Sequence, residues 1–204
     1  MIKKQKKYHH GDLKTALVRA GLEILETEGR AALTLRAIAA RAGVSHTAPK
    51  NHFDGLHGLL AAIAAEGFRM HAAEMRRGVE GMPAGRARLD AATEGYVRFA
   101  QEHPALFSLM FSPSFDRNAT KELQEAGAES YAVLSSIAKG LEWPKTPVTG
   151  DPRQDQQRTE MMLWSLVHGY AILFLSNRMP RDADGAPVFS VLDVMPRFDY
   201  GPDV

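Results

Sequence analysis

Polar side chains that can contact nucleic acid are concentrated in a short stretch near the N-terminus. The stretch contains His46, Thr47, Lys50, Asn51 and His52. Lysine is a donor to phosphate oxygens, and asparagine, histidine and threonine side chains can reach phosphates or base edges. These residue types suit base edges and phosphates better than a protein core. The chemistry that they predict is hydrogen bonding to DNA.

Two short helices joined by a tight turn are expected to hold this stretch. Thr34 can cap the first helix, and Gly43 lies where a left-handed residue would end it. Ser45 can cap a second helix over about residues 46–53, where Pro49 removes one donor but is tolerable close to the helix start. This is the layout of a helix-turn-helix, which places its second helix in the DNA major groove. A surface helical hairpin with no role in DNA binding has the same signals.

The charge of the chain is divided unevenly. Residues 1–53 contain ten Lys and Arg and four Asp and Glu, a net charge of +6, whereas the whole chain is +1. A basic N-terminal quarter in a near-neutral protein indicates a nucleic-acid module joined to something else. Four lysines in residues 3–7 would add phosphate contacts or lie in a minor groove, although a solvated tail has the same composition.

A further helix is expected over residues 12–28, between the basic segment and the helix-turn-helix. Asp12 can cap it and Gly29 would end it. Its apolar stripe consists of Leu13, Leu17, Ala20 and Ile24. Three helices can then form one small core, which at this size would lean on the next helix.

The segment from Tyr8 to Leu60 resembles the N-terminal DNA-binding domain of TetR-type transcriptional repressors. The matching residues are Gly29, Thr34-Leu35-Arg36-Ala37-Ile38-Ala39, Ala42-Gly43-Val44-Ser45 and His52-Phe53, together with Tyr8-His9-His10-Gly11-Asp12 before them. The resemblance implies an all-α fold. A three-helix helix-turn-helix head would occupy residues 1–54, and a helical bundle for ligand binding and dimerisation would occupy residues 55–204.

The resemblance also implies which residues contact DNA. The candidates are Lys6, Lys7, Thr34, Arg36, Ser45, His46, Thr47, Lys50, Asn51 and His52. Two positions depart from the family pattern. Lys50 stands where the family usually has a tyrosine that meets a phosphate, and Gly55 stands where it often has a lysine. One phosphate contact is therefore either missing or supplied by Lys50.

The remainder of the chain has the periodicity of a helical body. Helices are expected over residues 56–79, 86–102, 118–139, 156–179 and 188–195, with a short apolar segment over 104–111 and a loop over 142–154. The helix over 156–179 is apolar nearly all round but too interrupted to span a membrane. Family resemblance implies that one of its faces meets a second copy of the chain, whereas a fully buried helix of a monomer would have the same pattern.

Trp164, His168 and Gly169 have the Trp-x3-His-Gly spacing found in one branch of TetR-like C-terminal domains. The first two lie on one helix face because they are four residues apart. Residues that could line an effector pocket are Tyr96, Phe99, Phe107, Phe111, Tyr131, Trp164 and His168. The same side chains could be plain core.

Other classes of function have weak support in the sequence. The chain has eight His and no Cys, and it contains no metalloprotease, nucleophile-elbow or phosphate-loop motif. We therefore expect no catalytic residue, metal or cofactor. Without a signal peptide or a membrane-spanning segment, the protein is expected in the cytoplasm and not in a membrane.

The sequence therefore predicts a DNA-binding transcriptional regulator. Its expected partners are double-stranded DNA, a second copy of itself and a small-molecule effector, and its expected role is that of a ligand-responsive repressor on a palindromic operator. One alternative is a ligand-independent DNA-binding protein or activator whose body only dimerises. Another is a helical-bundle enzyme with His168 as a base.

Overall fold

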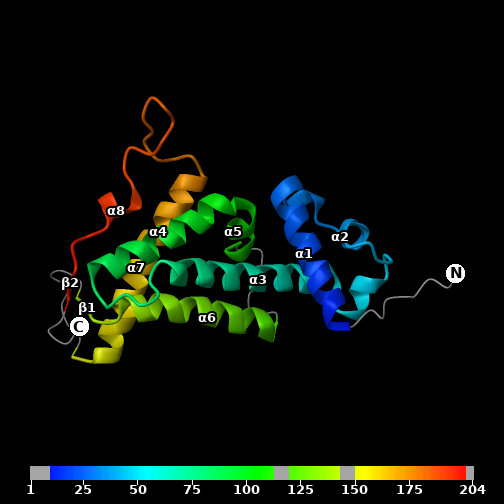
Figure 1. Ribbon diagram of the computed structural model, residues 1–204, viewed down its shortest axis with the longest axis horizontal. Helices are drawn as coiled ribbons and strands as arrows, with labels where there is room; N and C mark the ends of the chain where they lie inside the picture. The colour runs from blue at the N-terminus through cyan, green and yellow to red at the C-terminus, as the bar shows by residue number, and fades with distance from the viewer. Residues whose placement is uncertain (1–9, 113–119, 143–149, 201–204) are drawn as a thin grey trace. The chain divides into compact units, whose positions relative to one another are not determined.

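A computed structural model describes residues 10–112, 120–142 and 150–200, and it is almost entirely helical (Figure 1). The helices are α1 (His10–Glu28), η1 (Arg30–Ala32), α2 (Leu35–Arg41), η2 (Ala48–Asn51), α3 (Gly55–Arg77), α4 (Arg86–Glu102), α5 (Pro104–Met110), α6 (Lys121–Ala138), α7 (Pro152–Leu175) and α8 (Val191–Val194). Two short strands, β1 (Leu141–Glu142) and β2 (Asp199–Tyr200), pair antiparallel. The predicted all-α fold is confirmed, with this two-residue ladder as an addition.

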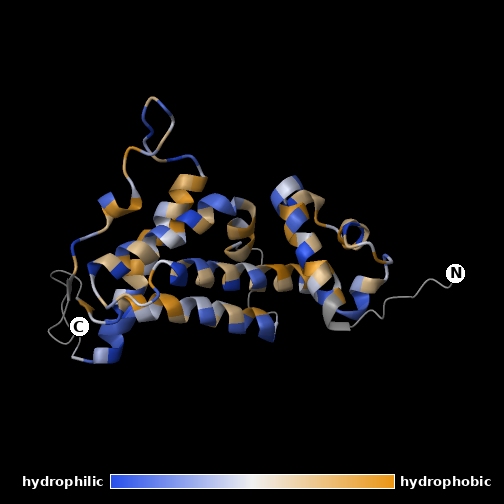
Figure 2. Ribbon diagram, in the orientation of Figure 1, coloured by the Kyte–Doolittle hydropathy of each residue, from blue (hydrophilic) through white to orange (hydrophobic). Residues whose placement is uncertain are grey.

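The chain divides into two compact units. The first comprises the described parts of residues 1–67 and 105–126, and the second those of residues 68–104 and 127–204. Two helices have residues in both units, because α3 passes from one to the other after Gly67 and α6 does so after Ala126. Figure 2 shows apolar and polar residues mixed along these helices, as expected of elements with one buried side.

The core of the first unit forms where α1 and α3 pass very close to one another. A Cβ atom on Gly21 would lie 2.4 Å from Cδ1 of Ile63, so a larger residue there would require the side chain of Ile63 to move. Leu17 and Ile24 of α1 and Ile38 of α2 are fully buried around it. The predicted helix is confirmed here, although α1 begins at His10 rather than at Asp12. Of the predicted stripe, Leu17, Ala20 and Ile24 are buried and Leu13 is half-buried.

The first helix of the helix-turn-helix has the predicted start and end. Thr34 has extended backbone, and its hydroxyl accepts a hydrogen bond of 3.1 Å from the amide of Ala37. Gly43 has a φ of +68°, the left-handed conformation that ends α2. The amide of Val44 then donates to the carbonyl oxygen of Ala39 at 3.0 Å. These contacts fix the turn that precedes the polar stretch.

The second helix of the motif differs from the prediction. In place of an α-helix over residues 46–53 the structure has η2, a 3-10 turn limited to Ala48–Asn51. Pro49 is the physical reason, since an α-helix over residues 46–53 would need an amide hydrogen at this position to bond to the carbonyl oxygen of Ser45, and proline has none. Ser45 does not cap a backbone amide as predicted, and its hydroxyl instead lies 3.1 Å from that of Thr47.

The core of the second unit lies between α4, α6 and α7. Its buried cluster consists of Val79, Leu89, Ala92, Leu134, Ile137, Ala138, Leu141, Leu163, Met195 and Phe198. The helix α4 has the predicted bounds and packs against both α7 and α8. Gly95 allows a close crossing with α3, since a Cβ there would lie 2.8 Å from the carbonyl oxygen of Glu74.

The long helix α7 begins and ends earlier than predicted. Asp151 caps it by accepting from the amide of Arg153 at 2.9 Å, and Pro152 occupies the first position, where a missing amide hydrogen costs nothing. The helix ends at Leu175, because Asn177 takes a left-handed φ of 56°. The predicted final helix over 188–195 shortens to α8, which begins after the capping residue Ser190.

Candidate functional site

The candidate DNA-contacting side chains lie on the surface of the first unit. Seven of them are exposed, and His52 is half-buried. The exposed ones are Thr34, Arg36, Ser45, His46, Thr47, Lys50 and Asn51. Lys6 and Lys7 lie outside the described residues. The turn η2 packs against α2, so the polar stretch is held by a helix whose start is itself capped.

Two of the basic side chains in this unit are used to hold helices together. Arg41 forms an ion pair with Glu28 at 2.5 Å, and Lys14 forms one with Glu122 of α6 at 2.5 Å. Arg36 and Lys50 differ, because no carboxylate of the described residues lies within ion-pair distance of either. These two cations are therefore available to phosphate groups.

Four side chains of the second unit form a polar cluster, which we call the aromatic–histidine cluster. His71 and Tyr96 in it are buried, and Trp164 and His168 are half-buried. The indole Nε1 of Trp164 donates to the hydroxyl of Tyr96 at 3.3 Å. That hydroxyl lies 2.9 Å from Nδ1 of His168. Because the indole can only donate, the tyrosine hydroxyl accepts from it. The donor in the bond between this hydroxyl and His168 is set by the tautomer of the imidazole.

Both histidines of the cluster are held in the neutral form. Burial, with a further contribution from His168, lowers the pKa of His71 from 6.5 to about 3. Burial also lowers the pKa of His168. Nδ1 of His71 lies 2.9 Å from the hydroxyl of Ser130, and its ring packs edge-on against Tyr96 at 4.3 Å between centroids. The cluster therefore joins α3, α4, α6 and α7 without a charge.

The neutrality of His71 predicts that the protein loses stability in acid. Below pH 6.5 the imidazole of His71 is protonated in the unfolded chain, whereas in the folded chain it stays neutral down to about pH 3. The free energy of unfolding therefore falls as the pH is lowered through this window. Between pH 7 and pH 5 the loss from this group is about 2 kcal/mol. Urea unfolding at the two pH values should show this extra loss in the wild type and in His57→Gln, which changes an exposed histidine, but not in His71→Gln. An equal loss in all three proteins would contradict this assignment.

Glu160 forms a second polar centre beside the cluster. Its side chain is 4% exposed and accepts hydrogen bonds from Ser135 at 2.7 Å, from Gln156 at 2.9 Å and from the hydroxyl of Tyr131. Burial opposes its ionisation, but the three hydrogen bonds together lower the pKa of Glu160. The carboxylate in turn raises the pKa of Tyr131 to about 12. This network ties α6 to α7.

The predicted effector residues are divided between the two units. Tyr96, Phe99, Tyr131, Trp164 and His168 belong to the second unit, and the ring of Trp164 meets those of Tyr131 and His168 edge-on. Phe107 and Phe111 belong to the first unit, where their rings lie 4.9 Å apart.

The interior next to the cluster is closely packed. A cavity lined by Met75, Leu89, Ala92, Thr93, Tyr96, Leu134, Ile137, Leu163 and Val167 has a volume of about 10 Å³. That is room for about one water molecule and not for an organic effector. An effector that enters here must therefore displace side chains and separate helices.

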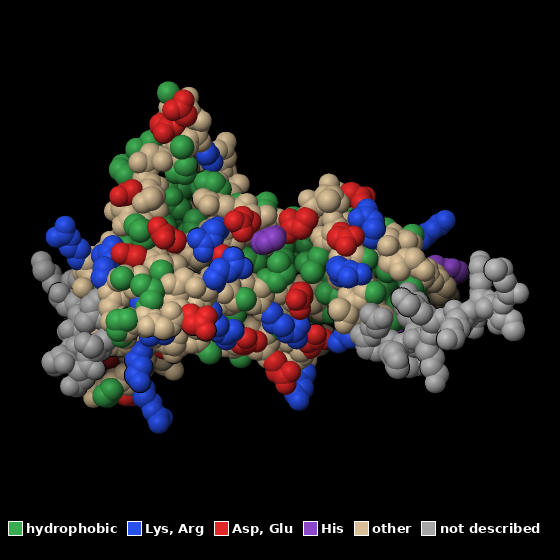
Figure 3. All heavy atoms as spheres, viewed as in Figure 1, with side chains coloured by type: hydrophobic (Ala, Val, Ile, Leu, Met, Phe, Trp, Pro, Cys, Tyr) green, Lys and Arg blue, Asp and Glu red, His purple; other side chains and the backbone are tan. Residues whose placement is uncertain are grey.

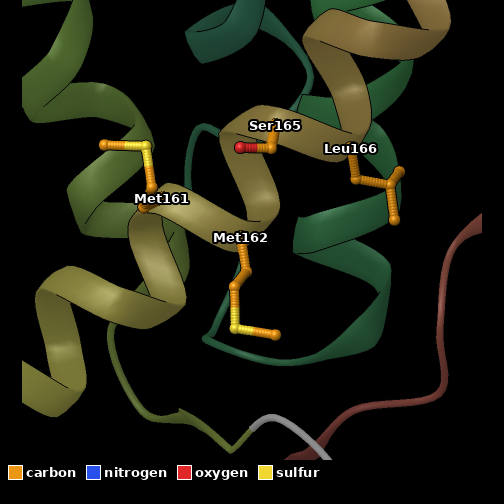
Figure 4. A pocket seen from close by; sticks show the side chains of 4 residues that line it. All are labelled: Met161, Met162, Ser165 and Leu166. Carbon is orange, nitrogen blue, oxygen red and sulfur yellow. The ribbon is translucent and has the colours of Figure 1, made fainter.

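The face of α7 that points away from its own unit is apolar and open. Met161, Ile172 and Leu173 on it are 53%, 42% and 47% exposed. A hollow of about 430 Å³ on this face is lined by Met161, Met162, Ser165 and Leu166 (Figure 4). One turn further, a Cβ atom on Gly169 would meet nothing within 4 Å. Small residues at the centre of an apolar helix face allow a second helix to approach closely.

Sequence reasoning missed His71, Ser130 and Glu160 as members of a site. A signal was present for His71, because it follows Phe68 and precedes Met75 on the buried face of α3, where a polar residue is unexpected. Across the described parts of the chain there is no group of three or more His, Asp or Glu that could hold a metal ion. Nor does any described helix combine the length and apolar character needed to cross a membrane.

Comparisons with known proteins agree with this architecture. Residues 89–193 match the family of tetracyclin repressor-like C-terminal domains. A solved structure of a protein of unknown function from Rhodococcus sp. RHA1 is 32% identical, with a TM-score of 0.69, and the match covers 90% of this chain and 91% of that one.

Two further relatives are described as transcription regulators. An uncharacterized HTH-type transcriptional regulator of Mycobacterium tuberculosis is 28% identical over 181 residues, which cover 86% of this chain and 75% of the relative. A TetR family transcription regulator from Marinobacter aquaeolei VT8 is 16% identical, with a TM-score of 0.58, over 84% of this chain and 88% of that structure, and it supports the fold alone.

Proposed function

Because the chain belongs to the TetR family of transcription regulators, we propose that it is a dimeric, ligand-responsive repressor that binds a palindromic operator. The observation that carries the proposal is the exposed polar stretch around Lys50 and Asn51, held by a capped helix-turn-helix. The second unit contributes an open apolar helix face and the aromatic–histidine cluster. Each of these features supports one part of the proposed function.

The DNA-reading role rests on side chains that are exposed and chemically suited to it. Asn51 can form a paired hydrogen bond with adenine in the major groove, and Lys50 can neutralise a phosphate in place of the usual tyrosine. Arg36 at the start of α2 is a second candidate for a phosphate contact. Because η2 is a 3-10 turn, the segment that contacts bases is short. We call residues 46–51 the reading segment, and the base contacts are concentrated there, between His46 and Asn51.

The open face of α7 supports dimerisation through this helix. An apolar helix face that includes Met161, Ile172 and Leu173 is unfavourable in water and favours burial against another apolar surface. Ser165 and Gly169 at its centre would let two copies of α7 cross closely around a twofold axis. A symmetric dimer then presents two heads to successive major grooves, about 34–36 Å apart on one side of the DNA.

Effector binding is proposed at the aromatic–histidine cluster and the neighbouring network of Glu160. An apolar interior with a few oriented polar groups is the usual composition of a small-molecule site. Two helices connect this region to the first unit. In α3, His71 belongs to the cluster, whereas Leu59 and Ile63 belong to the core of the first unit. In α6, Ser130 bonds to His71 and Glu122 forms the ion pair with Lys14.

These connections define how an effector would act. By opening the packed cavity beside Tyr96, the effector would favour a conformation in which α3 and α6 have shifted. Both helices reach α1 of the head, through Ile63 against Gly21 and through Glu122 against Lys14. A changed position of the heads would no longer match two successive grooves, so effector and operator would oppose each other's binding.

Two substitutions in the reading segment separate base contact from phosphate contact. Asn51→Ala is expected to cost about 1–3 kcal/mol at one base position and to relax specificity there. Lys50→Ala should weaken binding to all sequences alike and lower the salt slope of binding by about one unit. Titrations of the two variants against a set of single-base operator changes check both. An equal loss on every sequence for Asn51→Ala, or an unchanged slope for Lys50→Ala, would contradict these roles.

The closely packed interior favours one alternative, in which the second unit only dimerises and no effector exists. The cavity of about 10 Å³ is the observation that supports it. A thermal-shift screen of small aromatic compounds distinguishes the two functions. A compound that stabilises the protein and releases operator DNA supports the ligand-responsive repressor. If no compound does both, the ligand-independent function is favoured.

A further inference from the structure

A hairpin of residues 177–190 projects between α7 and α8, as the orange loop at the top of Figure 1. Most of its residues are exposed to solvent, namely residues 181–186 and 188–190. Figure 3 shows hydrophobic side chains along it and acidic side chains at its tip. Such a segment would be expected to be disordered unless its own bonds hold it.

Hydrogen bonds within the hairpin do hold it in one shape. The amide of Val188 donates to the carbonyl oxygen of Pro180 at 3.0 Å, and the amide of Asp182 donates to that of Ala186 at 2.9 Å. The carboxylate of Asp182 accepts from the amides of Asp184 and Ala186 at 3.0 and 2.9 Å. The hairpin is therefore preorganised, which lowers the entropy lost when it docks on a partner.

The base of the hairpin is fixed to the end of α7. The hydroxyl of Tyr170 donates to the carbonyl oxygen of Phe189 at 2.8 Å. The guanidinium of Arg181 lies over the ring of Phe174, 5.3 Å from its centroid. These contacts place Phe189 beside Tyr170 when its position is measured along the axis of α7.

Two large apolar side chains at this base face water. Val188 is 48% exposed and Phe189 is 50% exposed, and the exposed Ile172 and Leu173 lie one or two turns before the hairpin on α7. Exposed apolar side chains therefore occur both on the open face of α7 and on the hairpin that follows this helix. Because the main chain of Phe189 is bound while its ring is free to contact another surface, the ring has the features of an anchor for a partner.

We propose that Phe189 of one copy of this chain inserts into the hollow formed by Met161, Met162, Ser165 and Leu166 of a second copy. The proposal rests on the proposed dimer. A twofold axis perpendicular to α7 and midway between Ser165 and Gly169 makes the two helices antiparallel. Position 170 of one helix then lies opposite position 164 of the other. Position 164 is within the stretch 161–166 that lines the hollow.

The chemistry of the hollow suits an aromatic ring. Its volume is about 430 Å³, and three of its four lining side chains are apolar. Two of them are methionines, which adapt to the shape of a ring and make favourable sulfur–aromatic contacts. Symmetry repeats the contact, so one dimer contains two such anchors, and the hairpins clasp the pair of α7 helices from both sides.

Engineered disulfides test this contact directly, because the natural chain has no cysteine. The variant Phe189→Cys with Met162→Cys should form a covalent dimer under mild oxidation. A bond within one chain is disfavoured, since the levels of residues 162 and 170 on α7 differ by about 12 Å and a disulfide needs Cα atoms within about 7 Å. The matched control is Val194→Cys with Met162→Cys, which uses an exposed apolar residue of α8. A covalent dimer of the first variant only is the expected result.

Dimer dissociation measured by sedimentation gives an independent readout. Phe189→Ser should weaken the dimer by about tenfold or more, whereas Val194→Ser should change it little. If the wild type is a dimer but Phe189→Ser leaves its affinity unchanged and the cysteine pair does not crosslink, this contact is wrong and the dimer through α7 stands. A wild type that stays monomeric at high concentration would overturn both.

Discussion

Replacing Gly169 by arginine is expected to make the protein monomeric and to weaken operator binding by about 100-fold or more. Gly169 lies at the centre of the open face of α7, where added atoms meet nothing within their own chain. The folded monomer should therefore accept the side chain, while a second α7 helix could no longer approach. The loss of affinity arises because two linked heads bind with a high effective concentration that single heads lack.

The matched control for this substitution is Gly127→Arg. Gly127 is also a helical glycine with open space around its Cβ position, but it lies on α6. Sedimentation velocity gives the mass of each variant, and titration of labelled DNA gives its affinity. A dimeric Gly169→Arg protein, or a monomeric one with unchanged DNA affinity, would contradict dimerisation through this face.

Gly95→Leu is expected to lower the free energy of unfolding by about 3 kcal/mol or more. The reason is the close crossing of α3 and α4. A Cβ atom at this position would lie 2.8 Å from the carbonyl oxygen of Glu74 and 3.2 Å from Cα of Met75, and these backbone atoms cannot move aside as a flexible side chain could. The two helices must separate, which also disturbs His71 and Tyr96 of the aromatic–histidine cluster.

Gly127→Leu serves again as the comparison, because it adds the same atoms to a helical glycine of the same unit without a neighbour to meet. Its higher helix propensity should leave stability unchanged or slightly raised. Urea unfolding followed by circular dichroism measures both variants. Equal stability of the two proteins would mean that the crossing at Gly95 is less tight than the structure indicates.

Features set by residues close in sequence were predicted best. The cap at Thr34, the left-handed Gly43 and the bounds of α4 were predicted correctly, because each depends on neighbouring residues. The family and the all-α fold were confirmed as well. Asp151 followed by Pro152 was an equally local signal for a helix start, and sequence reasoning overlooked it.

The errors have two physical origins. At Pro49, a residue assumed to be tolerable near a helix start in fact limits the segment to a 3-10 turn, since an α-helix over residues 46–53 would need the amide hydrogen that proline lacks. At the cluster, contacts join residues far apart in the chain. His71 and Ser130 bond across 59 positions, and no periodicity within one helix predicts such a pair.

The candidate sites were predicted in part. Sequence reasoning named exposed residues around Asn51, and it named Tyr96, Trp164 and His168, which the structure joins by hydrogen bonds. It could not foresee that the space beside them is nearly full, because packing depends on all the helices at once. Roles in DNA and effector binding, and the Trp-x3-His-Gly branch, remain predictions.

Selection of bound sequences from a random pool of double-stranded DNA shows whether a dimer of this chain reads a palindromic operator. The wild-type protein should enrich one inverted repeat whose half-sites are centred about 10 base pairs apart, or a small multiple of that distance. Gly169→Arg, selected in parallel, should fail to enrich the repeat. Enrichment of a single site without symmetry, or of no sequence at all, would contradict the binding of a palindrome by a dimer.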